Sequence, residues 1–135
     1  VVIDTDVGAD IDDAFALALA VASPELNLVG VTTVGRGGPP DEFVRHVRKD
    51  RDEDRAWLVC RLLTQLGRKD VPVAPGADPQ PKSPLDWQIQ YRRHPAAVYN
   101  RTLRPTPESA VELLTRLARE QNGELVVVAL GPLTN

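Results

Sequence analysis

The sequence predicts an α/β fold, a Rossmann-like open parallel sheet with flanking helices. Apolar, β-branched runs alternate with segments of helical periodicity along the 135 residues, and this alternation is typical of a parallel sheet with right-handed crossovers. Hydrophobic residues make up 42% and charged residues 26% of the chain, as in a globular rather than a disordered protein. We expect residues 1–135 to form a single α/β domain that is the N-terminal part of a longer domain, since a further helix is expected after the last apolar strand.

The first half of the chain predicts two strands around one helix. Val1 to Ile3 is β-branched and borders Asp and Gly, as a short buried strand does. Asp10 is the expected N-cap of the following helix, and Ser23-Pro24 ends it. Its apolar residues at helical spacing are Phe15, Ala18, Leu19 and Ala22. Leu26 to Val34, rich in Val and Leu, is the expected second strand.

The second half predicts two further helices and two strands. Residues 41–55 form a mixed-charge run, expected to be a solvated helix or an exposed insertion. Residues 57–66 form an apolar helix that Gly67 caps. Val71 to Val73 is a short third strand, and residues 76–105 form a long loop of the kind that is usually functional or mobile.

The last helix is expected to begin at Thr106, with Pro107 at the first helical position and Glu108 in the first turn. Its predicted buried stripe consists of Val111, Leu114, Leu117 and Ala118. Gly123 closes this helix. Leu125 to Leu130 is then expected to be a final buried strand.

The most informative motif is an acidic run near the start of the chain. Five aspartates fall within ten residues, at Asp4, Asp6, Asp10, Asp12 and Asp13. Each carboxylate raises the pKa of its neighbours, and a bound hard cation resolves that conflict. Oxygen-rich sites suit Ca²⁺ or Mg²⁺. The plainer alternative is that acids in the first turn of a helix only complement its dipole, which leaves Asp4 and Asp6 unexplained.

Segments that follow the predicted strands are expected to meet at one edge of the sheet. Asp4 and Asp6, residues 33–38, residues 76–78 and residues 131–135 all follow strands. Ligands of open parallel sheets bind beyond the carboxyl ends of the strands. The acidic run therefore faces a predicted pocket.

Composition also restricts the kinds of partner that we expect the protein to bind. The net charge is −3, which does not favour a nucleic-acid or anionic-membrane partner. The longest apolar stretch, residues 14–22, is too short to cross a bilayer, and we expect a cytoplasmic protein. Cys60, the single cysteine, is expected to be a core thiol rather than a nucleophile.

The pattern Asp4-Thr-Asp6-x-Gly8-x-Asp10-x-Asp12-Asp13 resembles the N-terminal signature of the inosine-uridine-preferring nucleoside hydrolases. Residues 29–34, 71–76 and 130–135 resemble later segments of that family in order and spacing. The resemblance implies hydrolysis of the N-glycosidic bond of a nucleoside, with the chain corresponding to the first half of a usual member. It also implies a homo-oligomer.

The resemblance further implies roles for individual residues. Asp6 is expected to bind Ca²⁺ and to deprotonate the attacking water. Asp13 and the main-chain carbonyl of Leu130 are expected to be further metal ligands, and Asp12 is expected to hold ribose hydroxyls. Such a site suits a reaction whose transition state has oxocarbenium character, because anionic surroundings stabilise the developing positive charge.

Two alternatives stay open from the sequence. One is a non-catalytic sugar- or metal-binding relative, since residues 35–38 lack the Asn that contacts ribose in the family. The other is a dehalogenase-type phosphatase, which also opens with a strand and an Asp-x-Asp pair and would form an aspartyl-phosphate at Asp4.

Overall fold

The computed structural model of the chain describes residues 1–8, 11–34, 54–76, 103–133 and 135. Its centre is a parallel sheet of four strands in the order β3-β2-β1-β4. These strands are β1 (Val2–Thr5), β2 (Gly30–Thr33), β3 (Val73–Pro75) and β4 (Val127–Ala129). The predicted open parallel α/β sheet is confirmed.

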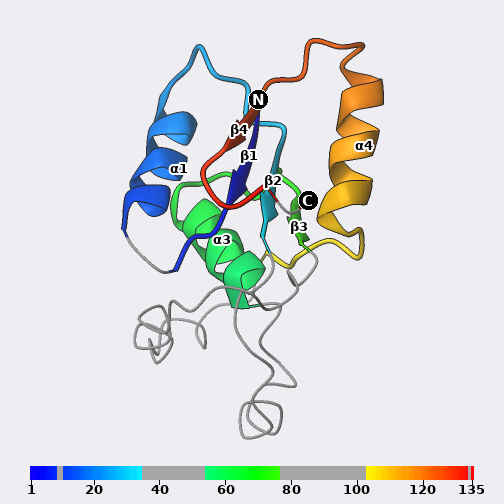
Figure 1. Cartoon of the computed structure of the whole chain (residues 1–135). Helices are drawn as coiled ribbons and strands as arrows, with labels where there is room; N and C mark the ends of the chain where they lie inside the picture. Colours follow the sequence, from blue (N-terminus) through cyan, green and yellow to red (C-terminus); the bar gives the residue numbers. More distant parts are fainter. Residues whose placement is uncertain (9–10, 35–53, 77–102, 134) are drawn as a thin grey trace, which may run out of the picture.

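In the described residues, three helices cover the two faces of the sheet (Figure 1): α1 (Asp12–Ala22), α3 (Asp54–Gln65) and α4 (Ala110–Glu120). Ile3 of β1 packs in one core cluster with Leu17 of α1 and Val59 of α3. Its neighbour Val2 packs in a second cluster with Leu113 and Leu117 of α4. The alternation follows from the two-residue period of a strand, which sends successive side chains to opposite faces.

The start of α1 differs from the prediction. Its N-cap position is Ile11, which makes no side-chain capping bond, and Asp10 lies outside the described residues. The apolar residues that recur at helical spacing are not the most buried ones, because Phe15 is 65% and Leu19 67% exposed, while Asp13, Leu17 and Ala20 are buried. Residues 14–22 are apolar around the whole helix, so periodicity alone selects no inward face.

The predicted helix is present as α3, but it runs from Asp54 to Gln65 rather than over residues 57–66. The residues of α3 buried in the core are Ala56, Val59, Cys60 and Leu63. Gly67 has a φ of 79°, and the following amide of Arg68 donates to the carbonyl of Leu63 at 2.8 Å, as in a glycine-terminated helix. Cys60 is buried as predicted, and its burial raises the pKa of the thiol to about 12.

Strands β2 and β3 are shorter or displaced relative to their predictions. β2 occupies only 30–33 of the expected 26–34, and β3 begins at Val73, where it was expected to end. The carbonyl of Pro72 still accepts from the amide of Val31 at 2.9 Å. Leu28 and Val71 are buried in the core outside the strands, which explains why they carry an apolar strand-like pattern.

Helix α4 begins later than expected. Its N-cap is Ser109, whose hydroxyl accepts from the amide of Glu112 while the Glu112 carboxylate accepts from the amide of Ser109. Thr106, the predicted cap, instead donates its amide to the carbonyl of Val73 at 2.7 Å. The helix therefore begins at a reciprocal Ser-x-x-Glu capping box that lies three residues after the predicted cap.

The buried stripe of α4 is shifted as a result. Ala110, Leu113 and Leu117 are buried, whereas Val111 is 51% exposed. Of the predicted stripe, only Leu117 is fully buried. The outer face carries an ion-pair network in which Arg116 contacts Glu108 and Glu120.

Strand β4 is exposed rather than buried, which corrects the prediction. Val127 is 50% and Val128 38% exposed, although both belong to a strand paired with β1. Of the described helices, α4 lies over β2 and β3, so the edge strand is left uncovered. Within the described ranges, no helix has the length and apolar character needed to span a bilayer.

Replacing Ser109 with Ala should lower the free energy of unfolding of the chain by about 1 kcal/mol, because the substitution removes the capping oxygen of α4. Urea denaturation measures the change. The exposed Thr115 on the same helix supplies a control, since Thr115→Ala removes a hydroxyl without removing a cap. Equal losses in both variants would show that the capping box contributes nothing specific.

Candidate functional site

The carboxyl ends of the strands meet as predicted. The end of β1 lies between its two neighbours: the amide of Val34 donates to the carbonyl of Thr5 at 2.9 Å, and the amide of Leu130 donates to the carbonyl of Asp4 at 2.8 Å. The segments after β2 and β4 are therefore attached to the residues that open the acidic run.

Asp4 lies inside this edge rather than at its surface. Asp4 is only 4% exposed. Its Oδ1 accepts hydrogen bonds from the Thr32 hydroxyl at 2.6 Å and from Asn135 Nδ2 at 2.8 Å. The same amide nitrogen donates to the carbonyl of Thr33 at 3.2 Å. A buried carboxylate requires such donors, since desolvation without them is costly.

Asp13 is the acid that α1 turns toward the sheet. It is 8% exposed, and its Oδ1 accepts from the Thr5 hydroxyl at 2.5 Å. The Thr5 oxygen in turn accepts from the amide of Val7 at 3.1 Å. This relay fixes the first turn of α1 against the end of β1, and it leaves Asp12 exposed.

Asp6 lies among other charged groups. Burial, the largest cause, raises the pKa of its carboxyl above the ordinary value. The charge of Arg55 lowers that pKa, while the charges of Asp13 and Asp12 raise it. The ionised form of Asp6 is therefore held in an environment where lost solvation and like charge together outweigh the nearby guanidinium.

Two glycines allow close contacts of the main chain at this edge. A Cβ on Gly131 would lie 3.1 Å from both the amide nitrogen and the Cβ of Asp6, so the main chain directly after Leu130 lies against Asp6. A Cβ on Gly76 would lie 1.9 Å from the carbonyl oxygen of Thr33 and 2.5 Å from Oδ1 of Asn135. The position of Gly76 therefore requires glycine for close approach, and a side chain at the position of Gly131 would be tightly packed against Asp6.

The predicted site residues can now be located. Asp12 and Asp13 are close enough to Asp6 for their charges to raise its pKa. The main chain at Leu130 bonds to Asp4, and Gly131 lies against Asp6. Residues 35–53 and 77–102 lie outside the described residues. These ranges contain the glycine-rich segment after β2 and most of the predicted long loop. The structure therefore brings the acidic part of the predicted site together.

Four further residues of this edge were not predicted individually: Thr5, Thr32, Arg55 and Asn135. A signal existed for three of them, because a carboxylate expected at a strand end needs donors, and Thr and Asn at neighbouring strand ends can supply them. No signal pointed to Arg55, which belongs to a run of mixed charge.

The donor chemistry is suited to a hard cation. Within the residues that the structure describes, no three His, Cys, Asp or Glu side chains are grouped to hold a metal. Two carboxylates coupled by charge, Asp6 and Asp13, and the adjacent main chain at Leu130 offer oxygen atoms only. Such a set fits part of the shell of Ca²⁺, which takes six to eight oxygen ligands, and does not suit a thiolate- or imidazole-seeking ion.

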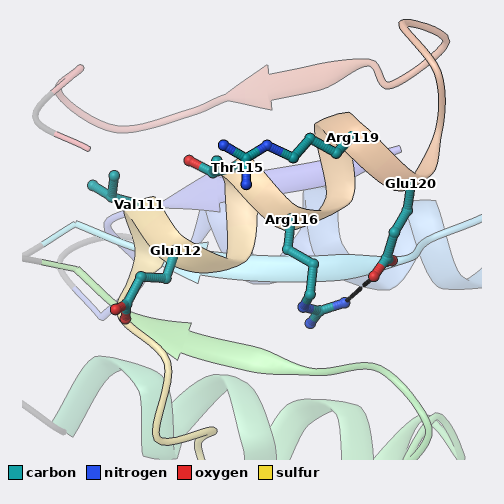
Figure 2. A pocket seen from close by; sticks show the side chains of 6 residues that line it. All are labelled: Val111, Glu112, Thr115, Arg116, Arg119 and Glu120. Carbon is teal, nitrogen blue, oxygen red and sulfur yellow. Dashed lines mark hydrogen bonds and ion pairs between the residues drawn. The ribbon is translucent and has the colours of Figure 1, made fainter.

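A separate hollow lies on the outer face of α4. Figure 2 shows its lining, Val111, Glu112, Thr115, Arg116, Arg119 and Glu120. All six belong to one helix, and Arg116 pairs with Glu120 across it. This surface lies apart from the acidic strand ends and contributes nothing to them.

Comparison with known proteins gives the family. The family model described as "Inosine-uridine preferring nucleoside hydrolase" matches residues 1–135. The chain is 37% identical to a pyrimidine-specific ribonucleoside hydrolase of Enterobacter sp. (strain 638), and 36% identical to one of Citrobacter koseri. Each match covers 100% of this chain and 40% of the relative, so the chain spans well under half the length of these relatives.

Solved structures show the same fold. A plant nucleoside hydrolase superposes with a TM-score of 0.68 at 28% identity, over 98% of this chain and 39% of that protein. A purine-preferring ribonucleoside hydrolase from Gardnerella vaginalis gives a TM-score of 0.66 at 21% identity, over 98% and 40% of the two chains.

Asp6→Asn should raise the stability of the metal-free chain at pH 7. The folded-state pKa of Asp6 is raised above 3.8, so the charged form destabilises the fold at any pH above that raised value. The gain should shrink as the pH falls through the raised pKa and vanish below 3.8, where the carboxyl is protonated in both states. Urea denaturation at several pH values, with a chelator present, measures this.

Asp70→Asn supplies a control of opposite sign. A hydrogen bond from Arg68 lowers the pKa of Asp70, so its charged form is favoured in the folded state and its loss should not stabilise the chain at pH 7. If Asp6→Asn destabilises the metal-free chain at pH 7 as well, the proposed electrostatic conflict at Asp6 is absent.

Proposed function

The chain belongs to the inosine-uridine preferring nucleoside hydrolase family, and on that premise we propose that it is the N-terminal part of a longer enzyme that hydrolyses the N-glycosidic bond of ribonucleosides to base and ribose. The observation that carries this proposal is the acidic edge, where Asp6 lies beside Asp13 and against the main chain after Leu130. Pyrimidine ribonucleosides are the first substrates to assay, because the relatives quoted above are named for them.

We assign the groups of this edge as follows. The carboxylates of Asp6 and Asp13 and the carbonyl of Leu130 would hold Ca²⁺. When bound, Ca²⁺ supplies a positive charge that orients a water molecule and lowers its pKa. Asp6 is assigned as the general base because its carboxylate lies at this edge beside Asp13 and against the main chain after Leu130, where it can accept a proton from the oriented water.

Asp12 completes the proposed site on the substrate side. It is exposed at the start of α1, next to the buried Asp13, and its carboxylate can accept hydrogen bonds from ribose hydroxyls. The sugar then lies over the anionic edge, where negative charge stabilises the positive charge that develops as the bond to the base breaks.

The position of Asp4 does not favour the phosphatase alternative. A phosphatase of that type needs Asp4 as an accessible nucleophile, but this residue is 4% exposed and its Oδ1 already accepts two hydrogen bonds. A nucleophile must reach the phosphorus atom directly. Membership of the nucleoside hydrolase family also disfavours a phosphatase.

The exposure of β4 supports the proposal that the domain is longer than the described chain. Val127 and Val128 belong to a strand of the sheet and are still 50% and 38% exposed, and the relatives are much longer than this chain. Further secondary structure packed on β4 would bury these side chains. Homo-oligomer formation and a cytoplasmic location stay predictions from the sequence.

In the longer protein, Asp6→Asn should lower kcat for base release by roughly 10²–10⁴-fold, the usual contribution of a general base, and a chelator should abolish turnover. Chromatographic assay of free base measures both effects. Asp70 precedes β3 and so lies at the amino ends of the strands, away from the acidic edge. Asp70→Asn should therefore retain wild-type activity.

Wild-type turnover in Asp6→Asn would remove Asp6 from the chemistry. Binding of a nucleoside by calorimetry, with no base released by the wild-type protein, would instead identify a non-catalytic binding relative. Full activity in the presence of excess chelator would exclude a dissociable metal ion from the reaction.

A further inference from the structure

We propose that Asn135 is a positioning residue, which holds the main chain at Leu130 and Gly131 against Asp6 through its bond to Asp4. This inference rests on the proposed function, because it gives that segment its place in the metal site. Asn135 is assigned no contact with substrate or with the reacting atoms.

The segment from Leu130 to Asn135 is attached to Asp4 at both of its ends. At the first end, the amide of Leu130 donates to the Asp4 carbonyl oxygen at 2.8 Å. At the second, the side-chain nitrogen of Asn135 donates to the Asp4 Oδ1 at 2.8 Å. Gly131, which lies against Asp6, stands between the two attachments.

Asn135 also ties this segment to a second strand. Its Nδ2 donates to the carbonyl of Thr33 at 3.2 Å as well as to Asp4. One amide group thus uses its two N–H bonds on the ends of β1 and β2. An alkyl side chain could donate neither bond.

In the part of the chain that the structure describes, the oxygen atom of the Asn135 amide makes no comparable bond, so this side chain acts as a hydrogen-bond donor. Within the described residues, Oδ1 of Asn135 is buried and has no hydrogen-bond partner. It lies over Gly76, where a Cβ would approach it to 2.5 Å. A buried oxygen without a partner is unfavourable, so the favourable contacts of this side chain are its two donated bonds.

The carboxylate of Asp4 is the acceptor of the bond from Asn135. It is buried, and the Thr32 hydroxyl donates to the same oxygen that Asn135 contacts. Both donors are neutral, and bonds to an ionised acceptor are stronger than bonds between neutral groups. The negative charge of Asp4 therefore fixes the segment after β4 more firmly than a neutral acceptor would.

The test uses the longer protein and the variant Asn135→Ala. We expect the Leu130 amide to exchange its hydrogen at least tenfold faster than in the wild type, because its segment is then attached at one end only. The Val2 amide, which donates to Val126 at the start of the same strand pair, should exchange at its wild-type rate. Equal acceleration of both amides would indicate general destabilisation and would overturn the inference.

Binding and turnover supply the functional readouts. In Asn135→Ala, calorimetric titration of the metal-free protein should show Ca²⁺ binding at least tenfold weaker than in the wild type, and kcat/KM should fall. Leu117→Ala is a stability control, since it opens a cavity under α4 on the other side of the sheet. It should leave Ca²⁺ affinity unchanged.

A charge exchange keeps the inference testable if Asn135→Ala does not fold. Asn135→Asp places two carboxylates together and should weaken Ca²⁺ binding. The double variant Asp4→Asn, Asn135→Asp restores one amide and one carboxylate, and it should recover part of the lost affinity. No recovery would overturn the inference.

The outcomes separate this inference from the proposed function. A wild-type protein that releases no base contradicts the proposed function, whereas the exchange rate of the Leu130 amide still decides whether Asn135 holds the segment. An active wild type whose Asn135→Ala variant keeps full activity, Ca²⁺ affinity and Leu130 protection contradicts this inference alone.

Discussion

The burial of the Asp4 carboxylate is the constraint on which the acidic edge depends. A carboxylate that is 4% exposed has lost most of its water, and hydrogen-bond donors must replace that water. Thr32 supplies one donor from β2, and Asn135 supplies another from the segment after β4. Residues far apart in the chain are thereby joined at the end of β1, where the candidate site lies.

A second carboxylate links this edge to α1. Asp13 is buried and bonded to Thr5, so the helix must present its acidic first turn to the sheet. Asp6 then lies near Asp13, and burial with like charge raises its pKa despite the opposing charge of Arg55. A hard cation would relieve this conflict by supplying positive charge between the carboxylates.

The errors of the sequence analysis have local physical reasons. In α1, apolar residues surround the helix, so periodicity alone selects no inward face, and the buried face is the one that carries Asp13, which bonds to Thr5. In α4, the Ser109–Glu112 capping box sets the start of the helix, while Thr106, the predicted cap, bonds to β3. In β4, an apolar pattern predicts burial, but the described helices leave that edge strand uncovered.

The sequence by itself determined the parallel α/β fold, the position of the acidic run at a strand end and the family. These features depend on local pattern: β-branched runs, helical spacing and the succession of aspartates. Only the tertiary structure decided which acids are buried, which donors meet them and that Arg55 lies near Asp6. Contacts between Asp4, Thr32 and Asn135 join residues whose separation along the chain carries no periodic signal, so only the paired strands bring them together.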